Sequence, residues 1–138
     1  MDLTKLKEEV NTSHDFSQKL GLVITRVSQG SAESEMPVTE GCCNPFRTVH
    51  GGILFTIADV TGGVAAYSYG SPVCTVDSDF HYLNAGLRST RLYASAQELK
   101  VGKRLLVYDV SVRDQTGLLL CKGTFTYSKL GQTAQAAR

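Results

Sequence analysis

A single helical pattern sets the architecture of this chain: Gly51-Gly52-Ile53-Leu54-Phe55-Thr56-Ile57-Ala58-Asp59-Val60-Thr61-Gly62-Gly63-Val64-Ala65-Ala66-Tyr67. Its large aliphatic residues recur at spacings of four, three and four: Ile53, Ile57, Val60 and Val64. This period is typical of one face of an α-helix set against a core. We therefore predict a helix from Gly51 to about Tyr67. Because Gly62 and Gly63 each lower helix propensity by about 1 kcal/mol relative to alanine, we expect close packing at this pair.

The segments around this helix have the patterns of strands. After the Gly70-Ser71-Pro72 break, four extended runs predict an antiparallel meander: 73–82, 91–101, 104–113 and 118–127. Upstream, residues 21–27 and a run through 36–38 predict a hairpin, and residues 2–10 have the spacing of a short amphipathic helix. The predicted class is α+β, with about six strands wrapped around one long central helix.

Length and composition indicate one domain over residues 1–138, with a helical segment at 1–18 and a frayed tail at 129–138. The net charge of +1 argues against nucleic acid or an anionic membrane as a partner. The longest uncharged run, 60–76, contains glycines and a proline, so we expect no membrane span. The four cysteines lack metal-ligand spacing, and no secretory signal is evident. We expect a cytoplasmic protein with reduced thiols, no metal and no cofactor.

Two features of the helix could carry chemistry. Gly51 and Gly52 leave the N–H groups of the first turn unshielded at the positive end of the helix dipole, where they could hold an oxyanion. The alternative is that these glycines only form a tight turn before the helix. Asp59 lies within the apolar helix, where a carboxylate is costly unless it is hydrogen-bonded, paired with a charge or used in function. Asp59 lies on the same side of the predicted helix as Gly52, Thr56 and Gly63, so this side carries small and polar residues. The alternative to a chemical role is that this side of the helix only faces solvent.

The spacing of these two features has a consequence for assembly. Gly51 and Asp59 are about 12 Å apart along the helix, and His50 and Asp59 about 13 Å. A reacting carbonyl must lie within about 3 Å of both an oxyanion donor and the attacking or proton-accepting group. If these residues share one site, two copies of the chain must form it, so this spacing predicts an obligate homodimer.

The run Asn44 to Asp59, with His-Gly-Gly and an Asp nine residues after the His, resembles the signature of hotdog-fold acyl-CoA thioesterases of the PaaI type. The resemblance covers roughly residues 22–127. It implies hydrolysis of an acyl-CoA to a free acid and CoA, with an aryl or arylacetyl group as one candidate. It also implies a homodimer, with two dimers forming a tetramer. An acyl pocket would lie at the dimer seam, near Leu54, Phe55 and the strand beginning at Val73.

The resemblance also implies roles for five residues. The Gly51 N–H would polarise the thioester carbonyl, and Asp59 would act as nucleophile or as general base on water. Asn44 would help to place the water or the thioester, His50 would order the loop near the sulfur, and Thr75 would lie close to Asp59.

Other interpretations of these residues stay open. Asn44 before Pro45 is also a common turn opener. Strict alternation from Phe80 would point Thr75 away from Asp59 unless a bulge intervenes. Basic residues could meet the phosphates of CoA or be solvated: Arg88, Arg91, Lys100, Lys103 and Arg104. Two rival functions are a hotdog enoyl-thioester hydratase or dehydratase and a non-catalytic acyl-CoA-binding protein.

Overall fold

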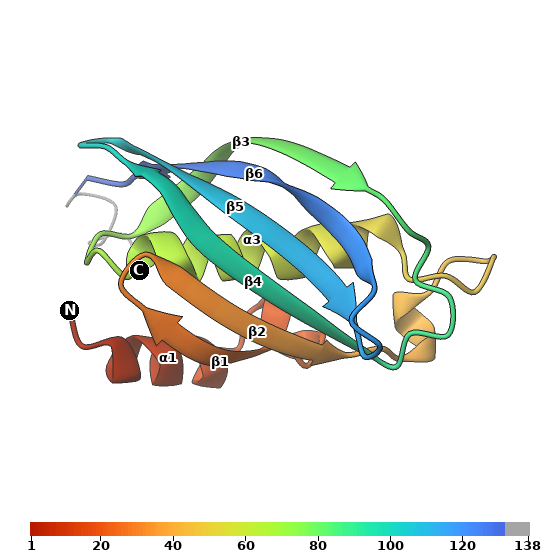
Figure 1. Cartoon of the computed structure of the whole chain (residues 1–138). Coiled ribbons are helices and arrows are strands. Elements are labelled where there is room, and N and C mark those ends of the chain that lie inside the picture. Colours follow the sequence, from red (N-terminus) through yellow and green to blue (C-terminus); the bar gives the residue numbers. More distant parts are fainter. Residues whose placement is uncertain (132–138) are drawn as a thin grey trace.

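The computed structural model describes residues 1–131 and has the expected α+β architecture (Figure 1). One long helix, α3 (Gly51–Tyr67), lies along a six-stranded antiparallel sheet. Its bounds are those predicted. The strands are β1 (Val23–Ser28), β2 (Ser31–Pro37), β3 (Val73–Tyr82), β4 (Arg91–Val101), β5 (Leu105–Asp114) and β6 (Leu119–Lys129). The shorter helices are α1 (Leu3–Thr12), α2 (Phe16–Lys19) and the 3-10 turn η1 (Glu40–Cys42).

The predicted four-stranded meander is wrong. The strand order is β1-β2-β4-β5-β6-β3, so only β4, β5 and β6 form a meander. β3 pairs antiparallel with β6, where Ser78 faces Phe125. The connection from β3 to β4, residues 83–90, is longer than the two to five residues of most hairpin loops and crosses the end of the sheet. β3 is therefore an edge strand.

The helix face that packs on the sheet agrees only in part with the predicted one, because Ile57 and Val64 are buried as expected and the other two predicted residues are not. The buried residues of α3 are Leu54, Ile57, Ala58, Thr61, Gly62, Val64, Ala65 and Ala66. Ile53 and Val60, which were predicted to face the core, are only partly buried. The reason is the size of the buried side chains. Alanine, glycine and threonine let the helix axis come close to the sheet, whereas large aliphatic residues would hold it away.

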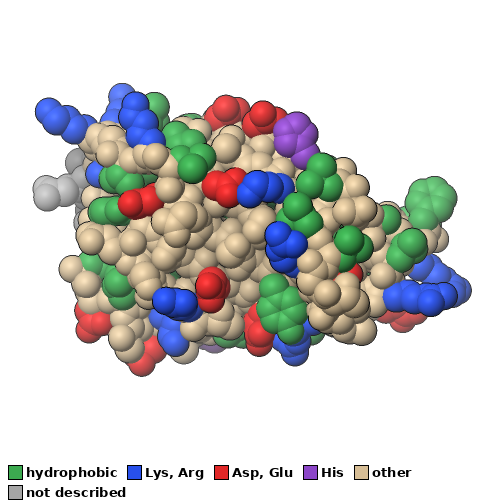
Figure 2. Space-filling view, viewed as in Figure 1, with side chains coloured by type: hydrophobic (Ala, Val, Ile, Leu, Met, Phe, Trp, Pro, Cys, Tyr) green, Lys and Arg blue, Asp and Glu red, His purple; other side chains and the backbone are tan. Residues whose placement is uncertain are grey.

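The two faces of the sheet are chemically different. Buried side chains such as Leu92, Ala94 and Ala96 of β4 face α3 and alternate with exposed ones. On the solvent side, acidic and basic groups are interspersed (Figure 2). Lys122 and Asp109, for example, form an ion pair at 2.7 Å. The core therefore lies between the sheet and α3.

The helix α1 and the end of β6 lie at the borders of this core. α1 packs beside β1 and buries Leu6. The predicted frayed tail starts too early, because Lys129 belongs to β6 and the Leu130 N–H donates to the Pro72 carbonyl at 2.8 Å. Residues 132–138 of that predicted tail lie outside the described residues.

Candidate active site

His50 and Gly51 shape the amino-terminal end of α3. His50 is the N-cap, and its Nδ1 accepts a hydrogen bond from the Gly52 N–H at 2.9 Å. This contact needs an unprotonated Nδ1, so the neutral ring carries its proton on Nε2. Within residues 1–131, the Gly51 N–H donates to no protein acceptor. A free backbone donor therefore lies at the positive end of the helix dipole.

Tyr82 packs directly against this helix end. A Cβ at Gly51 would lie 3.3 Å from Cε1 of Tyr82, and the Tyr82 hydroxyl donates to the Gly51 carbonyl at 3.0 Å. Beside them is a hollow of about 230 Å³ between α3 and the connection after β3, which Leu54 and Gly86 help to line. The glycine thus leaves room for a ligand atom to approach the free N–H.

Asp59 is half-buried on the side of α3 that faces β3. Its Oδ1 accepts a hydrogen bond from Thr75 Oγ1 at 2.7 Å and lies 3.4 Å from the Tyr127 hydroxyl. No donor in the described part of the chain reaches Oδ2. One oxygen is therefore held in place while the other is free to accept a proton or to attack a carbonyl.

The placement of Thr75 corrects the alternation argument from the sequence. A β-bulge interrupts the pairing of β3 with β6 between Thr75 and Asp77. The extra residue, Val76, shifts the period by one, so Thr75 faces α3 together with Phe80, whose ring packs against Phe55. The condition attached to the prediction is thus met: a bulge intervenes, and Thr75 points toward Asp59.

Tyr127 of β6 is a site residue that the sequence analysis missed. Its hydroxyl donates to the carbonyl of Asp59 at 2.8 Å. Burial and, secondly, the nearby Asp59 carboxylate raise the pKa of Tyr127, so the hydroxyl keeps its proton and remains a donor. The signal that could have found it is Gly62. A Cβ at Gly62 would lie 2.2 Å from this hydroxyl, which confirms the close packing expected at Gly62. At Gly63 the expectation is wrong, because a Cβ there would make only ordinary contact, 3.6 Å from Tyr127 Cε1.

Asn44 has the geometry of a turn residue. Its Oδ1 accepts from the N–H groups of Phe46 and Thr48 at 3.0 and 3.2 Å, and its Nδ2 donates to Thr48 Oγ1 at 2.7 Å. The loop contains Arg47 at a φ of 61°, and the Asn44 bonds hold this strained turn. The side-chain amide of Asn44 is therefore engaged in shaping the loop before His50.

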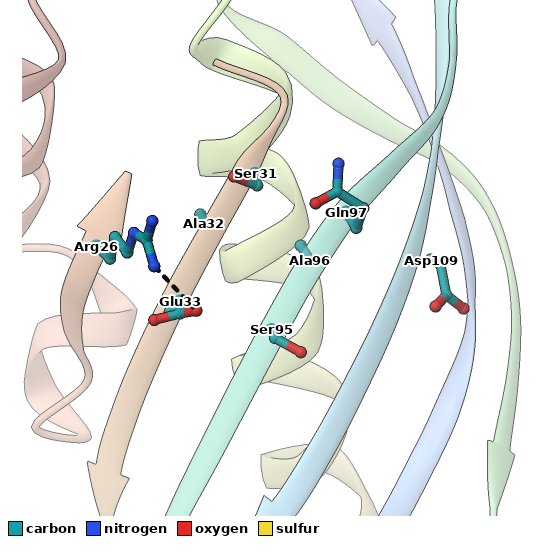
Figure 3. A pocket seen from close by; sticks show the side chains of 8 residues that line it. All are labelled: Arg26, Ser31, Ala32, Glu33, Ser95, Ala96, Gln97 and Asp109. Atoms are coloured by element: carbon teal, nitrogen blue, oxygen red, sulfur yellow. Dashed lines mark ion pairs between the residues drawn. The ribbon is translucent and has the colours of Figure 1, made fainter. Parts of the chain in front are cut away.

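Another hollow, of about 280 Å³, lies on the solvent face of the sheet (Figure 3). Polar and small residues line it: Arg26, Ser31, Ala32, Glu33, Ser95, Ala96, Gln97 and Asp109. Arg26 and Glu33 form an ion pair at 4.0 Å across it. The helix α3, which carries Asp59, runs behind the strands in this view, so the sheet lies between the hollow and this helix.

The candidate site consists of two groups on one helix. The Gly51 N–H lies at the amino-terminal end of α3, and the Asp59 carboxylate, with no donor to Oδ2 among the described residues, lies two turns further along. A model of the thioesterase superfamily matches residues 46–121, more than half of the chain. The chain belongs to the thioesterase superfamily. The matched range contains Gly51, Asp59 and Thr75.

Similar proteins support the same assignment for this thioesterase. The acyl-coenzyme A thioesterase PaaI of Escherichia coli is 33% identical over 103 residues, which are 72% of this chain and 71% of the relative. The structure of the E. coli PaaI protein matches with a TM-score of 0.86 at 25% identity, over 94% of both chains. A hypothetical thioesterase from Streptococcus pneumoniae, solved with coenzyme A, matches with a TM-score of 0.75 at 31% identity, over 80% of this chain and 87% of that one.

These matches confirm the hotdog fold, the PaaI-type resemblance and the thioester hydrolase class predicted from the sequence. Within residues 1–131, no three His, Cys, Asp or Glu side chains gather where they could hold a metal ion. None of the helices in this range has the length and apolarity needed to cross a membrane.

Proposed function

We propose that this thioesterase hydrolyses acyl-CoA at a site shared by two copies of the chain, with Gly51 of one copy facing Asp59 of the other. In the reaction, water adds to the thioester carbonyl and the C–S bond breaks, so that a carboxylic acid and CoA thiol form. The observation that carries the proposal concerns two groups on one helix, about 12 Å apart: the Gly51 N–H and Oδ2 of Asp59, neither of which has a hydrogen-bond partner among residues 1–131.

The Gly51 N–H would stabilise the charge that develops on the carbonyl oxygen. Backbone donors of this kind act where negative charge forms in the transition state, and the helix dipole adds to the effect. His50 would hold the turn through its bond to Gly52 and direct its Nε2 proton outward, toward the leaving sulfur. Asn44 would contribute by fixing the loop that carries His50.

Asp59 would attack the carbonyl or take a proton from the attacking water. Thr75 and Tyr127 hold Oδ1 and the backbone carbonyl of Asp59, so the carboxylate has little freedom to turn. A fixed carboxylate with one free oxygen suits either route. Both routes give the same products, an acid and a thiol.

The edge strand β3 is the surface on which a second copy would join. Among the residues that the structure describes, its outer edge has no strand partner, and Val76 at the bulge is 52% exposed. A ten-residue edge with an exposed apolar side chain is a ready site for pairing with another chain. Because Thr75 lies on this strand and contacts Asp59, a copy joined here would lie next to the carboxylate. Pairing of such dimers into a tetramer remains a prediction.

Replacement of Asp59 tests the chemistry. We expect Asp59→Asn to lower kcat by about 10²–10⁴-fold, because it removes the base or nucleophile while keeping the shape of the side chain. The readout is release of free thiol from an acyl-CoA, which a hydratase or a non-catalytic binding protein would not produce. Glu8→Gln, which changes an exposed acid of α1 outside the proposed dimer seam, is the control. Near-normal thiol release by Asp59→Asn would remove Asp59 from the mechanism.

A proline at position 51 tests the backbone donor. Gly51 is the first residue of α3, where proline is well tolerated, and His50 before it has the extended conformation that proline requires (φ −60°, ψ 134°). Gly51→Pro therefore deletes the N–H with little cost to the helix, and we expect about 10²–10³-fold lower kcat. Gly51→Ala adds a similar Cβ beside Tyr82 but keeps the N–H, so the further loss of kcat from Gly51→Ala to Gly51→Pro measures the backbone donor.

Mixing the two inactive variants tests whether the site is shared. A dimer of one Gly51→Pro chain and one Asp59→Asn chain would contain one intact site and one doubly defective site. Random reassembly of equal amounts should then restore about a quarter of the wild-type activity. If both groups act within one chain, the mixture stays inactive, and the shared site is refuted.

A further inference from the structure

Tyr82, the last residue of β3, bonds to the helix end that carries the proposed oxyanion donor. Its hydroxyl donates to the Gly51 carbonyl at 3.0 Å. Partial burial and, secondly, the nearby Cys121 raise the pKa of Tyr82, so the phenol keeps its proton and stays a donor at neutral pH. A carbonyl oxygen has two lone pairs, so the Gly51 carbonyl can accept this bond as well as its bond within α3.

The peptide group between Gly51 and Gly52 is thereby held at both ends. Tyr82 donates to its carbonyl, and Nδ1 of His50 accepts from its N–H at 2.9 Å. Glycine has the largest backbone freedom of any residue, and helix ends fray. These two side chains therefore hold a first turn that two successive glycines would otherwise leave free to move.

The ring of Tyr82 is itself held in place. Tyr82 pairs with Cys121 of β6 in the sheet. On the side of β3 that faces α3, the Phe80 ring packs edge-on against Tyr82, with centroids 5.3 Å apart, and also packs against Phe55 of the helix. The hydroxyl thus reaches Gly51 from a paired strand and a packed ring.

The same strand fixes the other half of the proposed site. Near its start, Thr75 donates to Oδ1 of Asp59 at 2.7 Å, and at its end Tyr82 donates to Gly51. In the proposed dimer, the second copy joins at the edge of β3. Both groups of the site are therefore tied to the strand at which two copies would meet.

We infer that Tyr82 is a positioning residue that orients the Gly51 N–H toward the thioester carbonyl. The inference rests on the proposed acyl-CoA hydrolysis and adds a residue that supports the oxyanion donor. A ring without the hydroxyl would still pack on Phe80, but the peptide between Gly51 and Gly52 would be held at one end only. Because a displacement of about 1 Å in a catalytic group can cost about 10²-fold in rate, loss of this bond should be measurable.

The first test measures thiol release by Tyr82→Phe, with the acyl-CoA that the wild type cleaves fastest among acetyl-, hexanoyl- and phenylacetyl-CoA. We expect kcat to fall about tenfold while KM changes by less than about twofold, because the N–H acts on charge that develops in the transition state. Tyr93→Phe, which removes a hydroxyl from an exposed tyrosine of β4, is the matched control and should keep both constants. An unchanged kcat in Tyr82→Phe would refute the positioning role.

The second test adds Tyr82→Phe to one chain or the other of the mixed dimer. When Gly51→Pro and Asp59→Asn chains are mixed, the intact site uses Gly51 of the Asp59→Asn chain. Tyr82→Phe in that chain should lower the restored activity about tenfold, whereas Tyr82→Phe in the Gly51→Pro chain should leave it unchanged. The two mixtures contain the same substitutions, so a loss of stability alone would lower both equally.

The outcomes separate this inference from the proposed function. No thiol release by the wild type from any of the three acyl-CoAs would refute the proposed function. Equal activity of the two mixtures would refute the link between Tyr82 and Gly51 of its own chain. If Gly51→Pro and Asp59→Asn chains restore no activity together, the shared site is refuted, and kcat of Tyr82→Phe alone still decides the role of Tyr82.

Discussion

Gly62→Ala should destabilise this protein, although alanine is the better helix former. A Cβ at Gly62 would lie 2.2 Å from the hydroxyl oxygen of Tyr127 and 3.0 Å from its Cζ. Tyr127 is 1% exposed, so its ring cannot swing into solvent. The next residue is the matched control, because a Cβ at Gly63 would meet the same ring at 3.6 Å without strain.

The size of the effect follows from three opposing contributions. Overpacking of a buried site costs about 1–3 kcal/mol. Displacing the hydroxyl from the Asp59 carbonyl costs about 1 kcal/mol more. Because alanine restricts the unfolded chain more than glycine does, the substitution also stabilises the fold by about 0.4–1 kcal/mol. The net loss is about 2 kcal/mol for Gly62→Ala, against a gain of up to about 1 kcal/mol for Gly63→Ala.

Thermal unfolding measures the difference directly. For a chain of this length the entropy of unfolding near the midpoint is about 0.3 kcal/mol/K. Gly62→Ala should therefore lower Tm by about 7 °C, while Gly63→Ala should raise it by up to about 3 °C. Equal midpoints for the two variants would refute the claim that the helix approaches the sheet through Gly62.

Further predictions concern single side chains. Thr75→Val removes the donor to Oδ1 of Asp59 and should lower kcat about tenfold with the fold intact, and an unchanged kcat would show that Thr75 does not position the carboxylate. Burial tends to raise the pKa of Asp114, but hydrogen bonds from the turn that follows outweigh this effect and hold the pKa below the usual value for an aspartate. Asp114→Ala should thus cost about 2 kcal/mol at pH 7, and the difference in Tm from the wild type should shrink as the pH falls below 3.8; a constant difference would contradict the assignment. Burial raises the pKa of Cys121 to about 12, so iodoacetamide at pH 8 should label it only after denaturation, which peptide mass analysis would detect.

Local patterns were enough to predict the long helix and most of the strands. The strand β2 was predicted through 36–38 and lies at Ser31–Pro37, and the short elements α2 and η1 were not predicted as separate elements. The helix α3 follows from its helical spacing between two strong breaks, Gly51-Gly52 and Gly70-Ser71-Pro72. The strands follow from alternation and β-branched composition. The face of α3 was predicted less well, because hydropathy selects large residues such as Val60, whereas the closest contact with the sheet uses small ones such as Ala58.

Long-range pairing and local irregularity lay beyond the sequence. The neighbour of β3 is β6, and the pairing of strands so far apart leaves no trace in a local pattern. The bulge at Val76 inserts one residue without any glycine or proline to mark it, yet it decides which way Thr75 points. Tyr127 likewise has the pattern of an ordinary strand residue, and only its close packing on Gly62 in the structure distinguishes it.

Core packing and the position of the carboxylate are coupled in this fold. The Tyr127 hydroxyl that fills the space above Gly62 also bonds the backbone carbonyl of Asp59 and approaches its Oδ1. A shift of this ring therefore moves a group in the core and, at the same moment, the proposed catalytic side chain. Because positioning errors of about 1 Å can cost about 10²-fold in rate, Gly62→Ala should lose activity at temperatures where it is still fully folded. That separation between lost turnover and retained structure distinguishes a positioning role of Tyr127 from a purely structural one.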